Sequence, residues 1–157
     1  MTKIITNRII LQVINIVNQL DLSKNELLKN KISINSSEWV KIKDQYDVDT
    51  YQSSLDNCIL AENGALLRDD KGNLSYTPEG EKKRLSEIEI IKDKSVYLNP
   101  YYCPLNDSIK EALGVGLVEI FSGILFKESD VEKYINFIKN EGFEEEPKKE
   151  PMVDMEK

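Results

Sequence analysis

The sequence predicts a mainly α-helical (α+β) protein that carries a small sheet of two or three strands. Over most of the first 91 residues, apolar residues recur at three- and four-residue spacing, the pattern of helices with one buried face. Two short apolar runs on either side of a charged turn, in ALLRDDKGNLSYTPEG (residues 65–80), predict a β-hairpin. More helical patterns follow a turn-rich stretch, so we expect a C-terminal helical extension.

The N-terminal third combines helical patterns with one short alternating run. Apolar residues of Asn7–Leu20 form a wide helical stripe, so we expect a helix there. Residues 23–26 (SKNE) form a capping box, in which Ser accepts a backbone amide and Glu reaches back, and they predict a short helix through Asn30. Lys31–Ile34 alternates polar and apolar residues and predicts a short strand.

Two further helices are expected before the hairpin. Ser36 or Ser37 can cap the first, and the Asp-Val-Asp run at residues 47–49 is expected to end it. The second helix, Thr50–Asn63, carries its apolar residues on one face. Gly64 follows it and suits the left-handed backbone conformation at a helix C-terminus.

The hairpin turns at residues 69–73 (DDKGN) and leads into another helix. Thr77 is a favourable N-cap, and Pro78 suits the first helical position because its missing N–H costs nothing there. The side chains that we expect to face the core from the hairpin and this helix are Leu66, Leu74, Tyr76, Leu85, Ile88 and Ile91.

Turn formers dominate Lys92–Asp107, within which Val96–Leu98 predicts a strand. Ser108–Phe126 is apolar and predicts a buried helix that is whole or is broken at its glycines. A second capping box at residues 129–132 (SDVE) opens the last helix.

These patterns divide the chain into three parts. We expect residues 1–91 to form the first domain and residues 92–143 to form a helical extension, which is a candidate for dimerisation or partner binding. Residues 144–157 are charged, contain two prolines and are expected to be a disordered acidic tail.

Residues 55–85, LDNCILAENGALLRDDKGNLSYTPEGEKKRL, resemble the recognition helix, wing and following helix of PadR- and MarR-like regulators. The shared features are a leucine-bearing helix, a Gly, a strand that ends in Arg, an Asp/Gly-rich wing tip and the junction YTPEG at residues 76–80. Over about residues 36–91 the resemblance implies a winged helix-turn-helix fold. It also implies a DNA-binding transcriptional regulator that acts as a dimer.

The resemblance places Thr50–Asn63 in the DNA major groove, with Gln52, Ser53, Asp56 and Asn57 pointing outward. Gln52 and Asn57 can make bidentate contacts to adenine, and Ser53 can reach a base or a phosphate. The basic side chains that can hold the DNA backbone are Lys41, Lys43, Arg68, Lys71, Lys82, Lys83 and Arg84.

The charge distribution favours a second function. The chain has a net charge of −7, residues 98–157 carry 7 Lys or Arg against 13 Asp or Glu, and the expected recognition helix has no basic residue. The alternative is therefore an acidic, non-enzymatic interaction or inhibitor protein, of the phage or plasmid accessory type, that uses the winged helix for protein docking.

Composition also limits the chemistry. The chain has no histidine, and its two cysteines, Cys58 and Cys103, lack CxxC spacing, so it cannot by itself supply a four-ligand zinc site. We expect no catalytic site, no metal and no cofactor. We see no signal peptide and no apolar run of membrane-spanning length, and we expect a cytoplasmic protein with no membrane partner.

Overall fold

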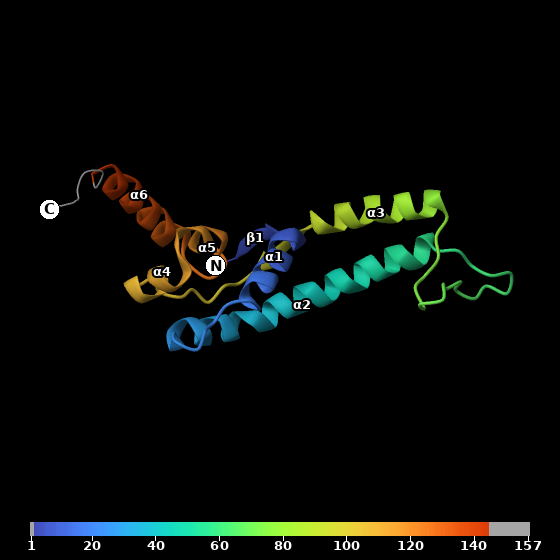
Figure 1. The fold of residues 1–157 in the computed structure, drawn as a ribbon, viewed down its shortest axis with the longest axis horizontal. Helices are drawn as coiled ribbons and strands as arrows, with labels where there is room; N and C mark the ends of the chain where they lie inside the picture. Colours follow the sequence, from blue (N-terminus) through green and yellow to red (C-terminus); the bar gives the residue numbers. More distant parts are fainter. Residues whose placement is uncertain (1, 145–157) are drawn as a thin grey trace. The chain divides into compact units, whose positions relative to one another are not determined.

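The computed structural model describes residues 2–144. This part of the chain is mainly helical with a small antiparallel sheet, the class that the sequence predicts. The two strands of the sheet are Lys3–Thr6, where no strand is predicted, and Ser95–Leu98. Its elements (Figure 1) are β1 (Lys3–Thr6), α1 (Asn7–Val17), α2 (Glu26–Asn57), α3 (Pro78–Lys92), β2 (Ser95–Leu98), α4 (Asp107–Leu113), α5 (Val115–Ile120) and α6 (Glu128–Glu144).

The described residues form two compact units. The helical unit contains residues 21–35 and 100–144, and the sheet unit contains residues 2–20 and 36–99. Helix α2 contributes its first ten residues to the helical unit and the rest to the sheet unit. The expected first domain, residues 1–91, therefore contains a segment that packs with the C-terminal helices.

In the sheet unit, β1 and β2 pair antiparallel, with Ile5 opposite Val96 and Lys3 opposite Leu98. The strand predicted at Val96–Leu98 is thus confirmed. Helix α1 follows β1 directly, because Thr6 caps it by accepting the Ile9 amide at 3.4 Å. The buried apolar side chains of this unit are Ile5, Ile10, Val13, Trp39 and Leu98.

Helix α2 is one continuous helix of 32 residues, and this overturns two expectations. The predicted strand at Lys31–Ile34 is wrong: Leu28, Ile32 and Asn35 are all buried, and their spacing is helical. The predicted break at residues 47–49 is also wrong.

Aspartates support α2 through its second half instead of interrupting it. Asp47 and Asp49 accept hydrogen bonds from Lys43 and Gln45, one turn earlier, at 2.8 and 2.9 Å. The N-cap expected at residue 23 is not found either. Asn25 accepts the Leu28 amide at 3.2 Å, so α2 begins two residues later than the capping box implies.

Residues 58–77, here called the apex, join α2 to α3. The expected helix through Asn63 is wrong, since α2 ends at Asn57. Three apex segments instead meet in a closed cycle of backbone hydrogen bonds: Ile59 donates to Ser75 at 2.8 Å, Ser75 to Leu67 at 3.0 Å, and Leu67 to Ile59 at 3.1 Å. The predicted hairpin is present as the antiparallel bridge between Arg68 and Leu74, and the segment after α2 joins it.

Helix α3 begins as predicted, with the Thr77 hydroxyl accepting the Gly80 amide at 2.9 Å and Pro78 at the first position. Its packing differs from the prediction, because no α3 residue is buried. Leu85 was expected in the core and is 49% exposed, and Ile88 and Ile91 are half-buried. Leu66, on the hairpin, is also exposed rather than buried.

The helical unit encloses the most apolar stretch of the chain. Of the two forms predicted for Ser108–Phe126, the structure has the broken helix, since Gly114, with φ of 82°, separates α4 from α5. The helical part ends at Ile120, and the prediction of helix through Phe126 is wrong. Phe121 and Phe126 are buried edge to face, with ring centroids 6.4 Å apart. Except for Glu144, which ends α6, the predicted tail lies outside the described residues.

Candidate functional site

The second half of α2 and α3 run side by side as a helical hairpin, defined here as residues 36–92 with the apex between the two helices (Figure 1). Polar groups join the helices. Ser53 Oγ donates to Glu87 Oε1 at 2.7 Å, and Asn57 Nδ2 donates to the same oxygen at 2.9 Å. These two hydrogen bonds lower the pKa of the Glu87 carboxyl.

The backbones of the two helices approach each other closely at Gly80. A Cβ built there would lie 2.5 Å from the Asn57 carbonyl oxygen. The close approach explains why a glycine suits the first turn of α3, where another residue would force the helices apart.

The inter-helix contact corrects the expected DNA-reading face. Ser53 is only 5% exposed and Asn57 is half-buried, so the expectation that both point outward is wrong. The physical reason is that α3 covers this side of α2. Gln52 and Asp56 are exposed as expected, and they hydrogen-bond each other at 2.8 Å.

The candidate backbone-binding residues fall into two groups. Three are engaged within the hairpin: Lys43 pairs with Asp47 at 2.8 Å, Arg84 with Glu81 at 2.8 Å, and Arg68 donates to the Gly72 carbonyl at 2.9 Å. The Arg84 guanidinium also lies 4.7 Å from the centre of the Tyr76 ring. The other candidates are exposed and form no ion pair within residues 2–144; they are Lys41, Lys71, Lys82 and Lys83.

Large apolar side chains are exposed along the whole hairpin. The exposed set comprises Val40, Val48 and Tyr51 on α2, Leu60, Leu66 and Leu67 on the apex, and Leu85 and Ile90 on α3. Sequence reasoning missed this surface because it assigned each apolar residue to a single buried face. The signal was present in α2, where apolar residues occur on opposite sides of the helix, as Trp39 and Val48 do.

A groove of about 370 Å³ lies between the two helices of the hairpin. Tyr46, Thr50 and Tyr51 line it from α2, and Arg84 and Ile88 line it from α3. Leu85 precedes Ile88 by one turn and extends this apolar surface. The arrangement offers shape and apolar contact for binding.

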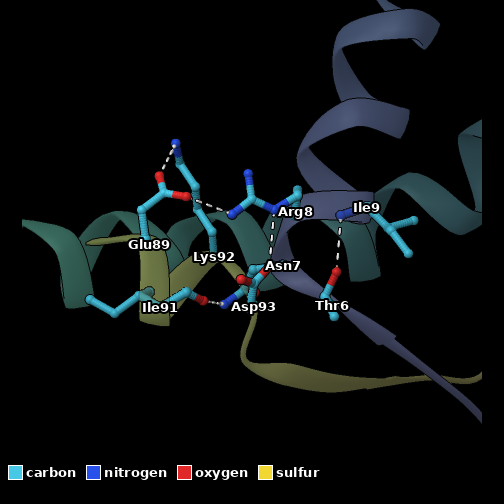
Figure 2. A network of polar contacts seen from close by, with 8 residues as sticks. All are labelled: Thr6, Asn7, Arg8, Ile9, Glu89, Ile91, Lys92 and Asp93. Atoms are coloured by element: carbon cyan, nitrogen blue, oxygen red, sulfur yellow. Dashed lines mark hydrogen bonds and ion pairs between the residues drawn. The ribbon is translucent and has the colours of Figure 1, made fainter. Parts of the chain in front are cut away.

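The far end of α3 is fastened to α1 (Figure 2). Arg8 donates to Glu89 at 2.9 Å and to Asp93 at 3.0 Å, and these bonds raise the pKa of the Arg8 guanidinium. The buried Asn7 side chain donates to the Ile91 carbonyl at 2.8 Å. Both ends of α3 are thus held by polar contacts, and none of its apolar side chains is fully buried.

Metal-ligating clusters and membrane-spanning helices are both absent from residues 2–144. Among residues 2–144, no group of three or more Cys, Asp or Glu side chains is arranged to hold a metal ion. No helix in that range combines the length and apolar character needed to cross a membrane. Both cysteines are free thiols, and burial raises the pKa of Cys103.

Comparison of the chain with protein-family models, with curated proteins and with solved structures gives no match.

Proposed function

We propose that the chain is a non-enzymatic interaction protein whose helical hairpin docks onto a protein partner through its exposed apolar side chains. The observation that carries the proposal is the packing of α3. This helix has 15 residues and buries none of them, although it contains Leu85, Ile88, Ile90 and Ile91. Most helices in proteins are stabilised by an apolar face packed against a neighbour. Because α3 buries none of its residues within the described chain, a partner packed against it would stabilise it.

The hairpin's surface supports a protein as that partner. Tyr51 is 52% exposed and Leu85 is 49% exposed, on either side of the inter-helix groove. Exposed apolar patches mark interaction sites, and tyrosine is enriched among the residues that contribute most to protein–protein binding. Asp47 and Arg84 also line the groove, and each is already paired within the hairpin, with Lys43 and Glu81 respectively.

Charge favours a protein partner over nucleic acid. Residues 36–92 contain 8 Lys or Arg and 12 Asp or Glu, and a DNA phosphate backbone is repelled by such an excess. Two of the residues expected to read bases, Ser53 and Asn57, are committed to Glu87.

DNA binding by a dimeric winged-helix regulator is the second candidate. It is supported by the exposed β-hairpin within the apex, bridged at Arg68 and Leu74, which carries Lys71. The exposed Lys82 and Lys83 in α3 also support it. A wing and the adjacent helix end can hold a DNA backbone through such lysines.

Site-specific photocrosslinking separates the candidates. A photoreactive amino acid replaces Tyr51 or Leu85, and a matched control places it at the exposed Lys139 of α6. We expect the two hairpin positions to crosslink the same protein in native cells and the control position not to do so. Competition by unlabelled wild-type protein should remove the crosslink.

The DNA candidate is tested on the same samples with labelled mixed-sequence duplex at low salt. Fluorescence anisotropy should show no duplex binding that is lost when the exposed lysines are replaced by glutamate. Duplex binding abolished by Lys71→Glu, Lys82→Glu and Lys83→Glu together, with no hairpin crosslink, would overturn the docking proposal in favour of DNA binding.

A further inference from the structure

The apex contains two turns that repeat the same geometry eight residues apart. In the first turn, the Ala61 amide donates to the Ala65 carbonyl at 2.8 Å, and the Gly64 amide donates to the Ala61 carbonyl at 2.9 Å. In the second turn, the amides at positions 69 and 72 make the corresponding hydrogen bonds at 2.8 and 3.0 Å. Gly64 and Gly72 have φ of 83° and 84°, the left-handed conformation that closes a short hairpin loop. The two turns are therefore equivalent in backbone structure.

The residue before the glycine distinguishes the two turns: it is Asn63 in the first and Lys71 in the second. Asn63 is the only asparagine in the sequence that glycine follows. Glycine has no Cβ to obstruct an approach between its own backbone nitrogen and the preceding side chain. Asn63 and Gly64 are both exposed, and a Cβ built at Gly64 would meet nothing within 4 Å. The first turn thus presents an uncrowded Asn-Gly pair to water.

The carboxamide of Asn63 is turned toward the backbone that follows it. Its Oδ1 accepts the Ala65 amide at 3.0 Å, which bends the side chain over the intervening Gly64 peptide. Its Nδ2 has no hydrogen-bond partner within residues 2–144. Asn57, in contrast, is half-buried and its Nδ2 donates to Glu87 at 2.9 Å. The amino group of Asn63 is therefore free to leave, whereas that of Asn57 is held.

We propose that Asn63 is a site of spontaneous deamidation. The Gly64 backbone nitrogen loses its proton to solvent base and attacks Asn63 Cγ, so that a bond from nitrogen to Cγ forms and the bond from Cγ to Nδ2 breaks. Nδ2 takes up a proton and leaves as ammonia. Water then opens the cyclic imide at either of its two carbonyl carbons, which gives aspartate or isoaspartate at position 63. Water is the co-reactant, and no group is oxidised or reduced.

The reaction changes the surface of the apex. Both products add a carboxylate, and isoaspartate also adds a methylene group to the backbone of the turn. That turn connects Leu60 and Leu66, which are exposed and form an antiparallel bridge. The Gly64 amide must release the Ala61 carbonyl before it can lose its proton. Exposed turns open at little free-energy cost, so we expect the folded protein to react within about tenfold of the rate of the unfolded chain.

Peptide mapping by mass spectrometry tests the proposal on the full chain. The protein is incubated in mildly alkaline buffer, with and without urea, and the converted fraction of each asparagine is followed over time. Electron-transfer fragmentation separates aspartate from isoaspartate. We expect Asn63 to convert and Asn73, which is also exposed on the apex but is followed by Leu74, to stay intact. The test needs no docking partner, so its outcome is independent of the proposed function.

Variants at the two equivalent turns supply the controls. Gly64→Ala should slow conversion about tenfold or more, because a methyl group then crowds the attacking nitrogen. Lys71→Asn places an Asn-Gly pair in the second turn and should create a second site of conversion, whereas Lys71→Gln should not. An Asn63 that stays intact in the folded protein but converts in urea would overturn the proposal. Conversion of Asn73 as fast as that of Asn63 would overturn it as well.

Discussion

The side-chain amide of Asn35 pairs with both backbone groups of Tyr101. Its Nδ2 donates to the Tyr101 carbonyl at 2.9 Å, and its Oδ1 accepts the Tyr101 amide at 2.9 Å. The same Nδ2 also donates to the Lys31 carbonyl at 2.8 Å, and Asn35 is only 2% exposed. Within the helical unit this side chain therefore ties α2 to the segment that leads into α4, and satisfies backbone groups that would otherwise lack partners.

Replacing Asn35 should destabilise the helical unit strongly. Asn35→Ala removes its hydrogen bonds to the amide and carbonyl of Tyr101 and to the carbonyl of Lys31, and each typical hydrogen bond contributes about 0.5–1.5 kcal/mol. We expect the free energy of unfolding in urea to fall by about 2–4 kcal/mol. Asn30→Ala, at an exposed position of the same helix, should change it by less than about 0.5 kcal/mol. Equal losses for the two variants would contradict the role assigned to Asn35.

Gly80→Ala should force α3 away from α2. Helix propensity alone favours alanine by up to about 1 kcal/mol, but the new Cβ would lie 2.5 Å from the Asn57 carbonyl oxygen. We expect a net loss of about 1–3 kcal/mol in unfolding free energy, the usual range for overpacking. Ser86→Ala, an exposed α3 position, serves as control and should be neutral or slightly stabilising. A stabilised Gly80→Ala protein would mean that the helices do not approach closely there.

The Ser53–Glu87–Asn57 cluster should make the hairpin sensitive to acid. The pKa of Glu87 is lowered from its ordinary value near 4.5 by hydrogen bonds from Ser53 and Asn57. A carboxyl with a lowered pKa in the folded state stabilises it fully above the unfolded pKa and loses that contribution as the pH falls through the folded pKa.

Unfolding free energies of wild type and Glu87→Gln, measured between about pH 6 and about pH 3, should therefore converge at the acidic end. The gap should be widest above the ordinary glutamate range, where the wild type keeps its carboxylate hydrogen bonds. Glu62→Gln, on the exposed apex, controls for removing one charge. A constant gap between wild type and Glu87→Gln at all pH values would show that the carboxylate makes no pH-dependent contribution.

Two nearby glycines should respond in opposite directions to alanine. Gly114 has φ of 82° and ψ of 162°, a region that only glycine adopts readily, and a Cβ there meets nothing within 4 Å, so the effect of alanine is backbone strain of about 1–3 kcal/mol. Gly116 lies in α5, also faces open space and has no such dihedral, so alanine should stabilise it by about 0.5–1 kcal/mol. Thermal unfolding of the two variants checks the prediction, and a shift of the same sign in both would contradict it.

Features that depend on a few neighbouring residues were predictable from the sequence. The Thr77-Pro78 helix start, the strand at Val96–Leu98 and the break at Gly114 follow from capping, β-branching and backbone freedom, which act over one or two turns. The helix that begins at Asn7 was predictable because its apolar stripe fits only the helical period over its full length.

Other features follow from long-range contacts. Residues 31–34 suit either a strand or a helix by local pattern, and packing of Leu28, Ile32 and Asn35 in the helical unit selects the helix. At the apex, hydrogen bonds connect Ile59, Leu67 and Ser75, which are eight residues apart in turn, and no local propensity encodes that cycle.

The sequence by itself determined the helical class, the small sheet, the acidic charge and most helix boundaries after the apex, because these depend on composition and short-range preference. Only the tertiary structure decided which side chains remain available for binding. Ser53 and Asn57 turn inward because Glu87, at least 30 residues further along, accepts their hydrogen bonds. Tyr51 and Leu85 stay exposed because neighbouring polar residues make the contact between α2 and α3. Ser53 and Asn57 of α2 hydrogen-bond Glu87 of α3.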